Sequence, residues 1–432
     1  MTGGPALADF APFPGVNYIR SNMLPGGTIQ IADSALDIKD SVFNMLRALG
    51  QATIILNNTV VTISNSTFTN NRQAAVGGVL GVGTSKLTVT DSRFEGNVGG
   101  QAGGVSILTN STLVLNGTVF DSNQGAQGGA VAVTNSTSAL ISACTFTNNT
   151  GSNGGAIYIN NVVGGDVLLY ANNFTSNGAV FSGGALFQQQ ADGELIDNVF
   201  SENLAAGGGA VWQSSCKSIN HFNNLFDSNV AKNGSTLEMN TITGAIQQTT
   251  FSNNRGLKGA ALYTAISDVA VTGCIFDSNA AAQQGGAVYR VASSGDISSC
   301  AFDSNTARQQ AGAIYDTQVT GDINMCSFDS NKAGTKPQGI YRLESTGSIN
   351  SPKGLADQDV QTISKSQEGS DPSAAGGVVS DVPSGVVSDV PPVSTDLPVA
   401  SDSPVASDGS TSPVGGSGGG GVQTLPTSSG RR

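Results

Sequence analysis

The sequence predicts an all-β fold, a right-handed parallel β-helix (solenoid) of about 12 stacked turns, or rungs, with a disordered C-terminal tail. Three observations predict it. The chain repeats itself about every 26 residues, several columns of one residue type keep their register within that repeat, and no segment shows the apolar spacing of an amphipathic helix. One such turn cannot bury its own aliphatic side chains, whereas stacked turns bury them as continuous columns.

The pattern Phe-x-x-Asn sets the register of the repeat. It occurs eleven times, at steps of 25, 26 or 28 residues, at Phe68, Phe94, Phe120, Phe146, Phe174, Phe200, Phe226, Phe251, Phe276, Phe302 and Phe328. We expect the rings to form one internal column. We expect the asparagines to lie at a corner, in left-handed backbone geometry, with their amides bonded from rung to rung.

A second column lies five residues before each phenylalanine, and ten of its eleven members are aliphatic. The exception is His221. Three interpretations remain open for it: a buried group that titrates, a neutral imidazole in the core, or a bulge that places Phe222 inside instead. The last two interpretations are favoured over a buried group that titrates.

A third element, Gly-Gly-Ala followed by an aliphatic residue, comes after five of the motif asparagines, for example at 154–157 and 183–186, with weaker copies at 259–262 and 311–314. We place that aliphatic residue inside, so strand alternation turns the following row of large side chains outward. The row comprises Tyr158, Phe187, Trp212, Met239, Tyr263, Tyr289, Tyr315 and Tyr341. An exposed aromatic row would stack on sugar rings or bury itself in a partner. In the alternative, the rings fill the core and the charged residues that follow the last three tyrosines point outward.

The alternation of Gly-Gly-Ala-Ile and Phe-x-x-Asn over residues 36–342 resembles the repeats of the chlamydial polymorphic outer-membrane proteins. The resemblance implies a pectin-lyase-like passenger β-helix at the cell surface, often adhesive. Those proteins end in a translocating β-barrel, a pattern that this chain does not share, so the resemblance leaves the secretion route open.

The repeat divides the chain into three parts. We expect an N-terminal segment or cap over residues 1–26, the repeat domain over 27–350, and a disordered tail rich in Pro, Ser, Val and Gly over 351–432. The tail lacks the apolar surface needed to offset the entropy of ordering it. We interpret it as an extended stalk or linker, with a simple spacer as the alternative.

Composition excludes some functions. The net charge is −12, so a nucleic-acid partner, which needs Lys and Arg to neutralise phosphates, is disfavoured. No apolar run is long enough to span a bilayer, and no signal peptide is visible. Either the chain is intracellular or its N-terminus is incomplete, and the resemblance to surface proteins favours a location at the cell surface or outside the cell.

Candidate chemistry is sparse. With one His, no Asp-Asp pair and no evident cluster of Asp with a nearby Arg base, we expect no catalytic residues. Asp277, Asp303 and Asp329 follow the last three motif phenylalanines and stack as like charges, which a bound Ca²⁺ would relieve; the alternative is three solvated carboxylates.

Cysteine and asparagine residues recur at one further position of the repeat. Cys144, Cys274, Cys300 and Cys326 all stand two residues before a motif phenylalanine, where we favour small buried hydrophobic side chains over a disulfide or metal ladder. Asn172, Asn198 and Asn224 hold the same position on other rungs and predict an amide ladder.

Near the C-terminal end of the repeat domain, Arg290, Asp316 and Arg342 predict a ladder of alternating charge. If exposed, that ladder would discourage end-to-end stacking of rods. Together these features predict a non-catalytic rod with an adhesive or structural role, whose partner is a cell-surface glycan or protein. The alternatives are a glycan-binding module and a carbohydrate-active enzyme.

Overall fold

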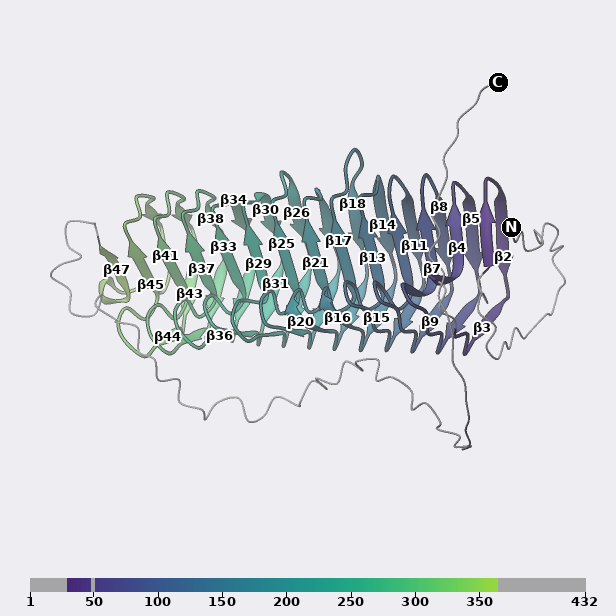
Figure 1. Cartoon of the computed structure of the whole chain (residues 1–432). Coiled ribbons are helices and arrows are strands. Elements are labelled where there is room, and N and C mark those ends of the chain that lie inside the picture. The colour runs from purple at the N-terminus through teal and green to yellow at the C-terminus, as the bar shows by residue number, and fades with distance from the viewer. Residues whose placement is uncertain (1–28, 48–50, 364–432) are drawn as a thin grey trace, which may run out of the picture. The chain divides into compact units, whose positions relative to one another are not determined.

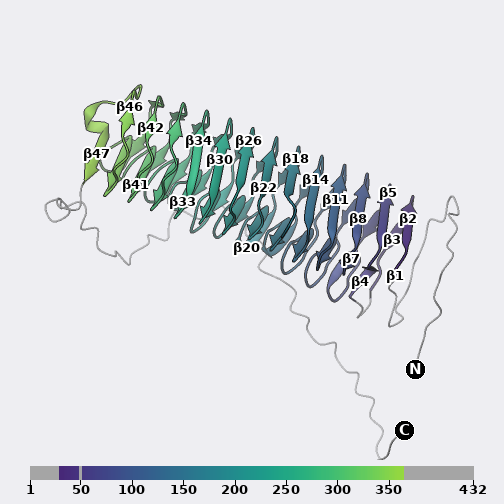
Figure 2. The same ribbon diagram turned by 90° about the horizontal axis from the view of Figure 1, so that it is seen from above.

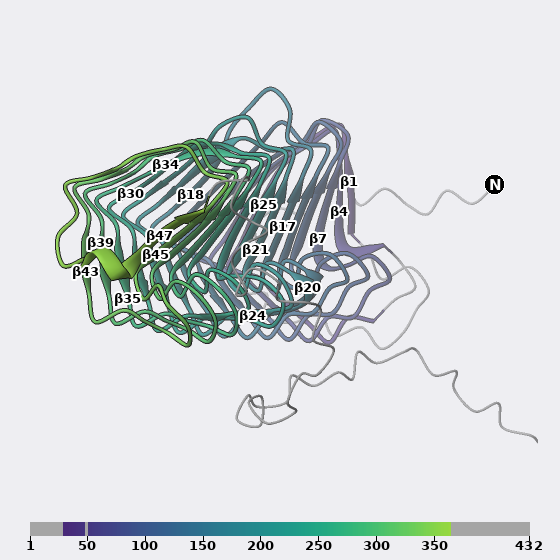
Figure 3. The ribbon, with the colours of Figure 1, turned by 90° about the vertical axis from the view of Figure 1, so that its left-hand side faces the viewer.

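The computed structural model describes residues 29–47 and 51–363. Within them the chain forms a parallel β-helix, in which every pairing between named strands is parallel. Four sheets run along the stack, with 14, 13, 12 and 8 strands, and successive strands of one sheet come from successive rungs. Figure 1 shows the strands side by side along the axis, Figure 2 shows the stack from above, and Figure 3 looks towards one end of the stack.

The 14-stranded sheet begins most rungs and receives the Gly-Gly-Ala motif at its entrance. Its strands are β1 (Ile29–Ala32), β4 (Ala52–Asn57), β7 (Val76–Val82), β10 (Val105–Leu108), β13 (Val131–Thr134), β17 (Ile157–Asn160), β21 (Leu186–Gln189), β25 (Val211–Ser214), β29 (Leu237–Asn240), β33 (Leu262–Ala265), β37 (Val288–Val291), β41 (Ile314–Thr317), β45 (Ile340–Leu343) and β47 (Val360–Ile363).

The 13-stranded sheet follows and carries the aliphatic column with His221. Its strands are β2 (Ala35–Lys39), β5 (Val60–Ser64), β8 (Lys86–Thr90), β11 (Thr112–Asn116), β14 (Ser138–Ser142), β18 (Val167–Tyr170), β22 (Gly193–Ile196), β26 (Ile219–Phe222), β30 (Thr243–Gln247), β34 (Asp268–Thr272), β38 (Ile297–Ser298), β42 (Ile323–Asn324) and β46 (Ile349–Asn350).

The 12-stranded sheet carries the phenylalanine column. Its strands are β3 (Val42–Asn44), β6 (Thr67–Thr69), β9 (Arg93–Glu95), β12 (Val119–Asp121), β15 (Thr145–Thr147), β19 (Asn173–Thr175), β23 (Val199–Ser201), β27 (Leu225–Asp227), β31 (Thr250–Ser252), β35 (Ile275–Asp277), β39 (Ala301–Asp303) and β43 (Ser327–Asp329). These twelve strands confirm the predicted number of rungs.

The fourth sheet has eight short strands: β16 (Thr150–Asn153), β20 (Gly178–Ser182), β24 (Leu204–Ala205), β28 (Val230–Ala231), β32 (Arg255–Gly256), β36 (Ala280–Ala281), β40 (Thr306–Ala307) and β44 (Lys332–Ala333). The helical content of the described residues is a single 3₁₀ turn, η1 (Asp357–Asp359), which leads into β47. Because β47 pairs in parallel with β45, the ordered stack extends beyond the boundary at residue 350 that the repeat predicts. Segment 1–26 and the tail from residue 364 lie outside the described residues.

The motif phenylalanines form the predicted internal column. All eleven, together with Phe43 on the first rung, are buried, and neighbouring rings lie parallel with centroids 4.5–5.0 Å apart. This spacing matches the distance of about 4.8 Å between paired strands, so the backbone pairing itself brings the rings into contact. The column and the aliphatic residues of the two larger sheets make up one continuous core.

The motif asparagines form the predicted ladder, and their side chains are buried or nearly so. From Asn71 to Asn331, each amide nitrogen donates to the next amide oxygen along the axis at 2.9–3.1 Å. The expectation of left-handed geometry at these asparagines was wrong by one position. The residue just before each of them has the positive φ, for example Asn70 at 52° and Glu202 at 56°, because the corner turns there and then directs the Asn side chain inward.

Candidate functional site

His221 is a core residue. Its ring is buried within the aliphatic column, and its Nε2 donates to Gln213 Oε1 at 2.9 Å, whose amide in turn donates to Gln188 Oε1 at 2.9 Å. Burial lowers the pKa of His221 to about 3, so the imidazole is neutral at physiological pH. Phe222, the alternative core residue, points outward, which excludes the bulge and leaves His221 in the core position.

Arg290, Asp316 and Arg342 form the predicted ladder of alternating charge, but it lies inside the helix. Arg290 Nε and Nη2 donate to the two Asp316 carboxylate oxygens at 2.8 Å, and Arg342 Nε lies 3.2 Å from Asp316 Oδ2. All three side chains are buried. The guanidinium groups also donate to turn carbonyls, Arg290 to Gly295 and Arg342 to Gly347. A role at an exposed surface, in preventing end-to-end stacking, is therefore wrong.

The cysteine column is also internal. The five cysteines of the chain are all buried and free, as expected for small hydrophobic side chains. Burial raises the pKa of Cys144 to about 12, so this thiol remains protonated and is a poor nucleophile.

The aromatic row faces away from the main core, as strand alternation predicts, yet much of it is covered. Phe187, Tyr289, Tyr315 and Tyr341 are buried, whereas Tyr158, Trp212 and Tyr263 are half-buried. The rings stack in two runs, Tyr158 to Trp212 and Tyr263 to Tyr341, with centroids 4.5–5.7 Å apart. The alternative, in which rings fill the core and charges point outward, is wrong because Arg290 and its partners take the inward positions.

The turns at the Gly-Gly-Ala position of the repeat, which reads Gly-Ala-Ala at residues 259–261, cover part of the aromatic row. Gly208 and Gly259 have positive φ values of 54° and 56°, and a Cβ on them would lie 2.7–2.8 Å from the Cβ of Trp212 and Tyr289 respectively. Each glycine therefore lets the chain turn directly against an aromatic residue of its own or the next rung. A continuous exposed stripe of rings, which the binding hypothesis requires, does not exist.

Met239 is not part of this row. The register pairs Trp212 with Glu238, and Met239 is one position further along, inside the core. Glu238 separates the two runs of rings, and its carboxylate accepts hydrogen bonds from Asn240 Nδ2 and the Gly208 amide, both at 3.3 Å. Burial raises the pKa of Glu238.

Asp277, Asp303 and Asp329 lie in register on β35, β39 and β43 and point outward, as predicted. Each carboxylate accepts a hydrogen bond from the serine that follows it, at 2.8–3.1 Å. Within residues 29–47 and 51–363, no group of three or more His, Cys, Asp or Glu side chains converges as metal ligands would. The row is a straight line of carboxylates, and Ca²⁺ binding there stays a prediction.

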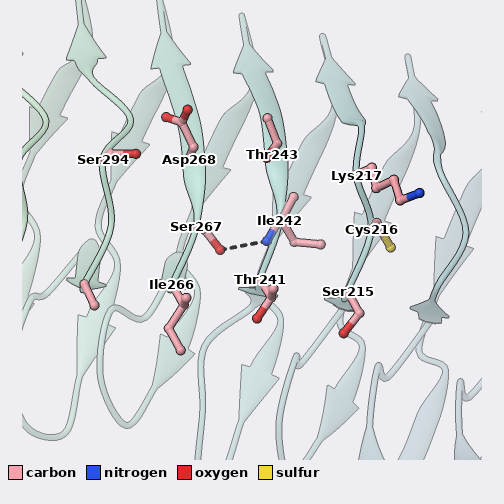
Figure 4. A pocket seen from close by; sticks show the side chains of 11 residues that line it. Ser215, Cys216, Lys217, Thr241, Ile242, Thr243, Ile266, Ser267, Asp268 and Ser294 are labelled. Atoms are coloured by element: carbon pink, nitrogen blue, oxygen red, sulfur yellow. Dashed lines mark hydrogen bonds between the residues drawn. The ribbon is translucent and has the colours of Figure 1, made fainter.

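A shallow depression of about 540 Å³ lies where the 14-stranded sheet turns into the 13-stranded sheet (Figure 4). Hydroxyl, apolar and a few charged side chains from four rungs line it, and the Ser267 hydroxyl accepts a hydrogen bond from the Ile242 amide at 3.1 Å. Cys216 lies at its edge, and burial raises the pKa of that thiol. The lining offers no pair of nucleophile and base, so we assign no chemistry to the depression.

Another surface, which the sequence analysis missed, lies at the opposite edge of the 13-stranded sheet. Tyr170, Ile196 and Phe222 end β18, β22 and β26, pair in register and point outward. Val199 and Leu225 begin the strands after the corner and also point outward. These five residues form what we call the corner patch. Tyr170 is 46% exposed and Phe222 is 39% exposed, which is unusual for side chains of this size.

The second asparagine ladder lies directly behind the corner patch. Asn172, Asn198 and Asn224 stand at the corner itself, and their amides are linked at 3.0 and 3.1 Å. Their amide nitrogens also donate to the backbone carbonyls of Ile141, Leu169 and Leu195 at 2.7–2.9 Å. Other rungs have Ser, Thr or Cys at this position. The rungs that carry the patch are therefore those whose corner is held by buried amide bonds.

The surroundings of the corner patch are acidic. Residues 157–208, which make up two of its three rungs, contain no Lys or Arg but five acidic residues, Asp166, Asp192, Glu194, Asp197 and Glu202. The third rung adds Asp227, Lys217 and Lys232, so acidic residues outnumber basic ones by six to two over residues 157–234. Asp166, Glu194 and Glu202 are exposed. The Asp197 carboxylate at the corner accepts a hydrogen bond from Asn223 Nδ2 at 2.8 Å, which orients both turn residues.

Comparison with known protein families agrees with the fold. Residues 77–243 match the family model described as a right handed beta helix region, which supports the predicted hand. A crystal structure of PfbA, a surface adhesin of Streptococcus pneumoniae, is similar with 14% sequence identity and a TM-score of 0.40, over 71% of this chain and 86% of that chain. No curated protein matches the sequence. No helix of the described residues is long and apolar enough to cross a membrane.

Proposed function

We propose that the chain is a non-catalytic rod, at the cell surface or outside the cell, with an adhesive role exerted through its outer face. The observation that carries the proposal is the corner patch, an exposed apolar surface mounted on rungs with an additional internal ladder. A surface that is rigid before binding loses little conformational entropy when a partner docks. Large exposed apolar groups on soluble proteins mark interaction sites.

The non-catalytic part of the proposal is supported by where the titratable groups lie. The one histidine faces the interior with a pKa of about 3, and the row of aspartates beside the phenylalanine column is straight and solvated. General acid–base catalysis needs such groups to converge on one bound substrate.

An adhesion assay with the full chain tests the proposal. Beads coated with the chain should bind to cells, and the Tyr170→Ser, Phe222→Ser double variant should lose most of that binding. Val60→Ser, which removes an apolar side chain that is 54% exposed on β5, four rungs before β18, is the matched control and should bind normally. Equal binding by the double variant would contradict an adhesive role for the patch. Release of reducing sugars from a polysaccharide panel by the wild-type chain would favour the enzyme alternative.

A further inference from the structure

We infer that the corner patch takes a polypeptide ligand whose contact face combines apolar side chains with Lys or Arg. The inference rests on the proposed function and names the chemical class of the partner. It combines three features of the same rungs: the apolar side chains of the patch, the acidic residues around them, and the buried amide ladder behind them.

The composition of the patch favours a protein over a glycan. Three of its five members, Ile196, Val199 and Leu225, are aliphatic, and its two rings are separated by a rung. Sugar recognition relies on the faces of aromatic rings, whereas aliphatic and aromatic side chains together form the centre of a protein interface, surrounded by a polar rim. Here Glu194, two residues before Ile196 on β22, and Glu202, three residues after Val199, supply exposed carboxylates for such a rim.

The negative charge around the corner patch favours a basic partner over a second copy of the chain or an anionic membrane. A second copy of this chain would bring one acidic rim against another, and the chain as a whole has a net charge of −12. An anionic membrane surface would be repelled for the same reason. A basic partner would instead be attracted during encounter and would pair its cations with the rim carboxylates around a desolvated apolar centre.

The register of the patch fits an extended segment that runs along the helix axis. Tyr170, Ile196 and Phe222 are successive partners in one sheet, so they repeat every 4.8 Å or so and span about 10 Å. A ligand strand presents side chains on one face every 6.5 Å or so, which is sufficient to place two or three apolar side chains on the patch.

Calorimetric titration of the full chain with two synthetic peptides tests the inference. One peptide alternates valine and lysine, and the other alternates valine and glutamate. We expect the lysine peptide to bind, with an affinity that falls as salt is raised, and the glutamate peptide not to bind. The Tyr170→Ser, Phe222→Ser double variant should bind the lysine peptide at least tenfold more weakly. The Glu194→Gln, Glu202→Gln double variant should bind it several-fold more weakly and with a smaller salt dependence. The control Val60→Ser should bind the lysine peptide as the wild type does.

Several outcomes would overturn the inference. One is equal affinity of the wild type for both peptides. Another is an unchanged affinity for the lysine peptide in the double serine variant at an unchanged thermal midpoint. The last two are self-association of the wild type, or its binding to a glycan array, that the double serine variant abolishes. The self-association and glycan results would assign the patch to a second copy or to a sugar. If adhesion to cells is lost in the double variant while neither peptide binds, the proposed function stands and only the partner class is wrong.

Discussion

At the scale of single residues, the interior of the helix is built by columns in which each side chain contacts its own equivalent on the next rung. Phe200 lies between Phe174 and Phe226, with both ring centroids 4.8 Å away. If one ring is removed, the neighbouring rings cannot move into its space, because the strand pairing holds them at a fixed spacing. A truncated side chain in this column therefore leaves a cavity.

Phe200→Ala should lower the free energy of unfolding by about 3–5 kcal/mol. Chemical denaturation of the purified full chain, followed by tryptophan fluorescence and circular dichroism, measures the change. The control is Phe222→Ala, an aromatic residue of the same size on the outside, which should change stability by no more than about 1 kcal/mol. Similar losses in both variants would contradict the inside and outside assignments.

His221 predicts a pH dependence of stability. Its pKa of about 3 in the folded chain lies below the value of about 6.5 expected when unfolded, so the unfolded chain binds this proton more tightly. Its contribution to stability is therefore fully present above pH 6.5 or so and is lost as the pH falls towards 3, by up to about 1.4 kcal/mol per pH unit.

His221→Leu should remove that part of the pH dependence. Unfolding midpoints measured between pH 4 and 8 should fall more steeply with acid in the wild type than in the variant. The variant is expected to be less stable at pH 8, because Gln213 Oε1 loses its hydrogen bond. Parallel pH profiles for the two chains would show that the imidazole is not buried as described.

At the scale of elements, the three short strands β38, β42 and β46 belong to rungs in which charge is buried. These strands have two residues each, where earlier strands of the same sheet have four or five. Arg290 reaches the turn carbonyl of Gly295, and Arg342 reaches those of Gly321 and Gly347. The arginines thus supply hydrogen bonds to turns that precede the shortened strands, and Asp316 neutralises one of the two charges.

Asp316→Ala should destabilise the chain by about 3–5 kcal/mol, because it leaves two buried guanidinium groups facing each other without a counter-ion. Replacing all three residues by apolar ones, Arg290→Met, Asp316→Leu and Arg342→Met, should recover much of that loss. Thermal and chemical unfolding measure both. Asp303→Asn, an exposed carboxylate nearby, is the control and should stay within about 0.5 kcal/mol of the wild type. A loss below 1 kcal/mol in Asp316→Ala would contradict the buried ladder.

At the scale of the whole molecule, the repeat predicted most of the fold, because a parallel β-helix places equivalent residues in columns that a sequence period reveals. The Phe, Asn and aliphatic columns followed directly. The inward position of Arg290 did not follow, because two rules conflict there. Strand alternation places Arg290 inside when Tyr289 points outward, whereas charged side chains are expected to face solvent. The strand β47 was missed because Val360–Ile363 lies beyond the last copy of the motif.

The candidate site was harder to predict than the fold. The aromatic row was conspicuous in the sequence, yet the glycine turns that pack against Trp212 and Tyr289 become visible only in three dimensions. The corner patch lacked a sequence signal of its own, because Tyr170, Ile196 and Phe222 are different residue types. The available signal was indirect: Asn replaces Ser, Thr or Cys behind the patch on the same rungs.

Hydroxyl-radical footprinting of the full chain, read residue by residue by mass spectrometry, tests the central claim most directly. The claim is that the helix buries its phenylalanine column and its last tyrosines and presents the corner patch to solvent. We expect rapid oxidation of Tyr170 and Phe222 and strong protection of Tyr341 and Phe200, which are no more than 1% exposed. Protection of the patch residues in the free chain, or oxidation of Phe200 at the rate of Phe222, would contradict the account.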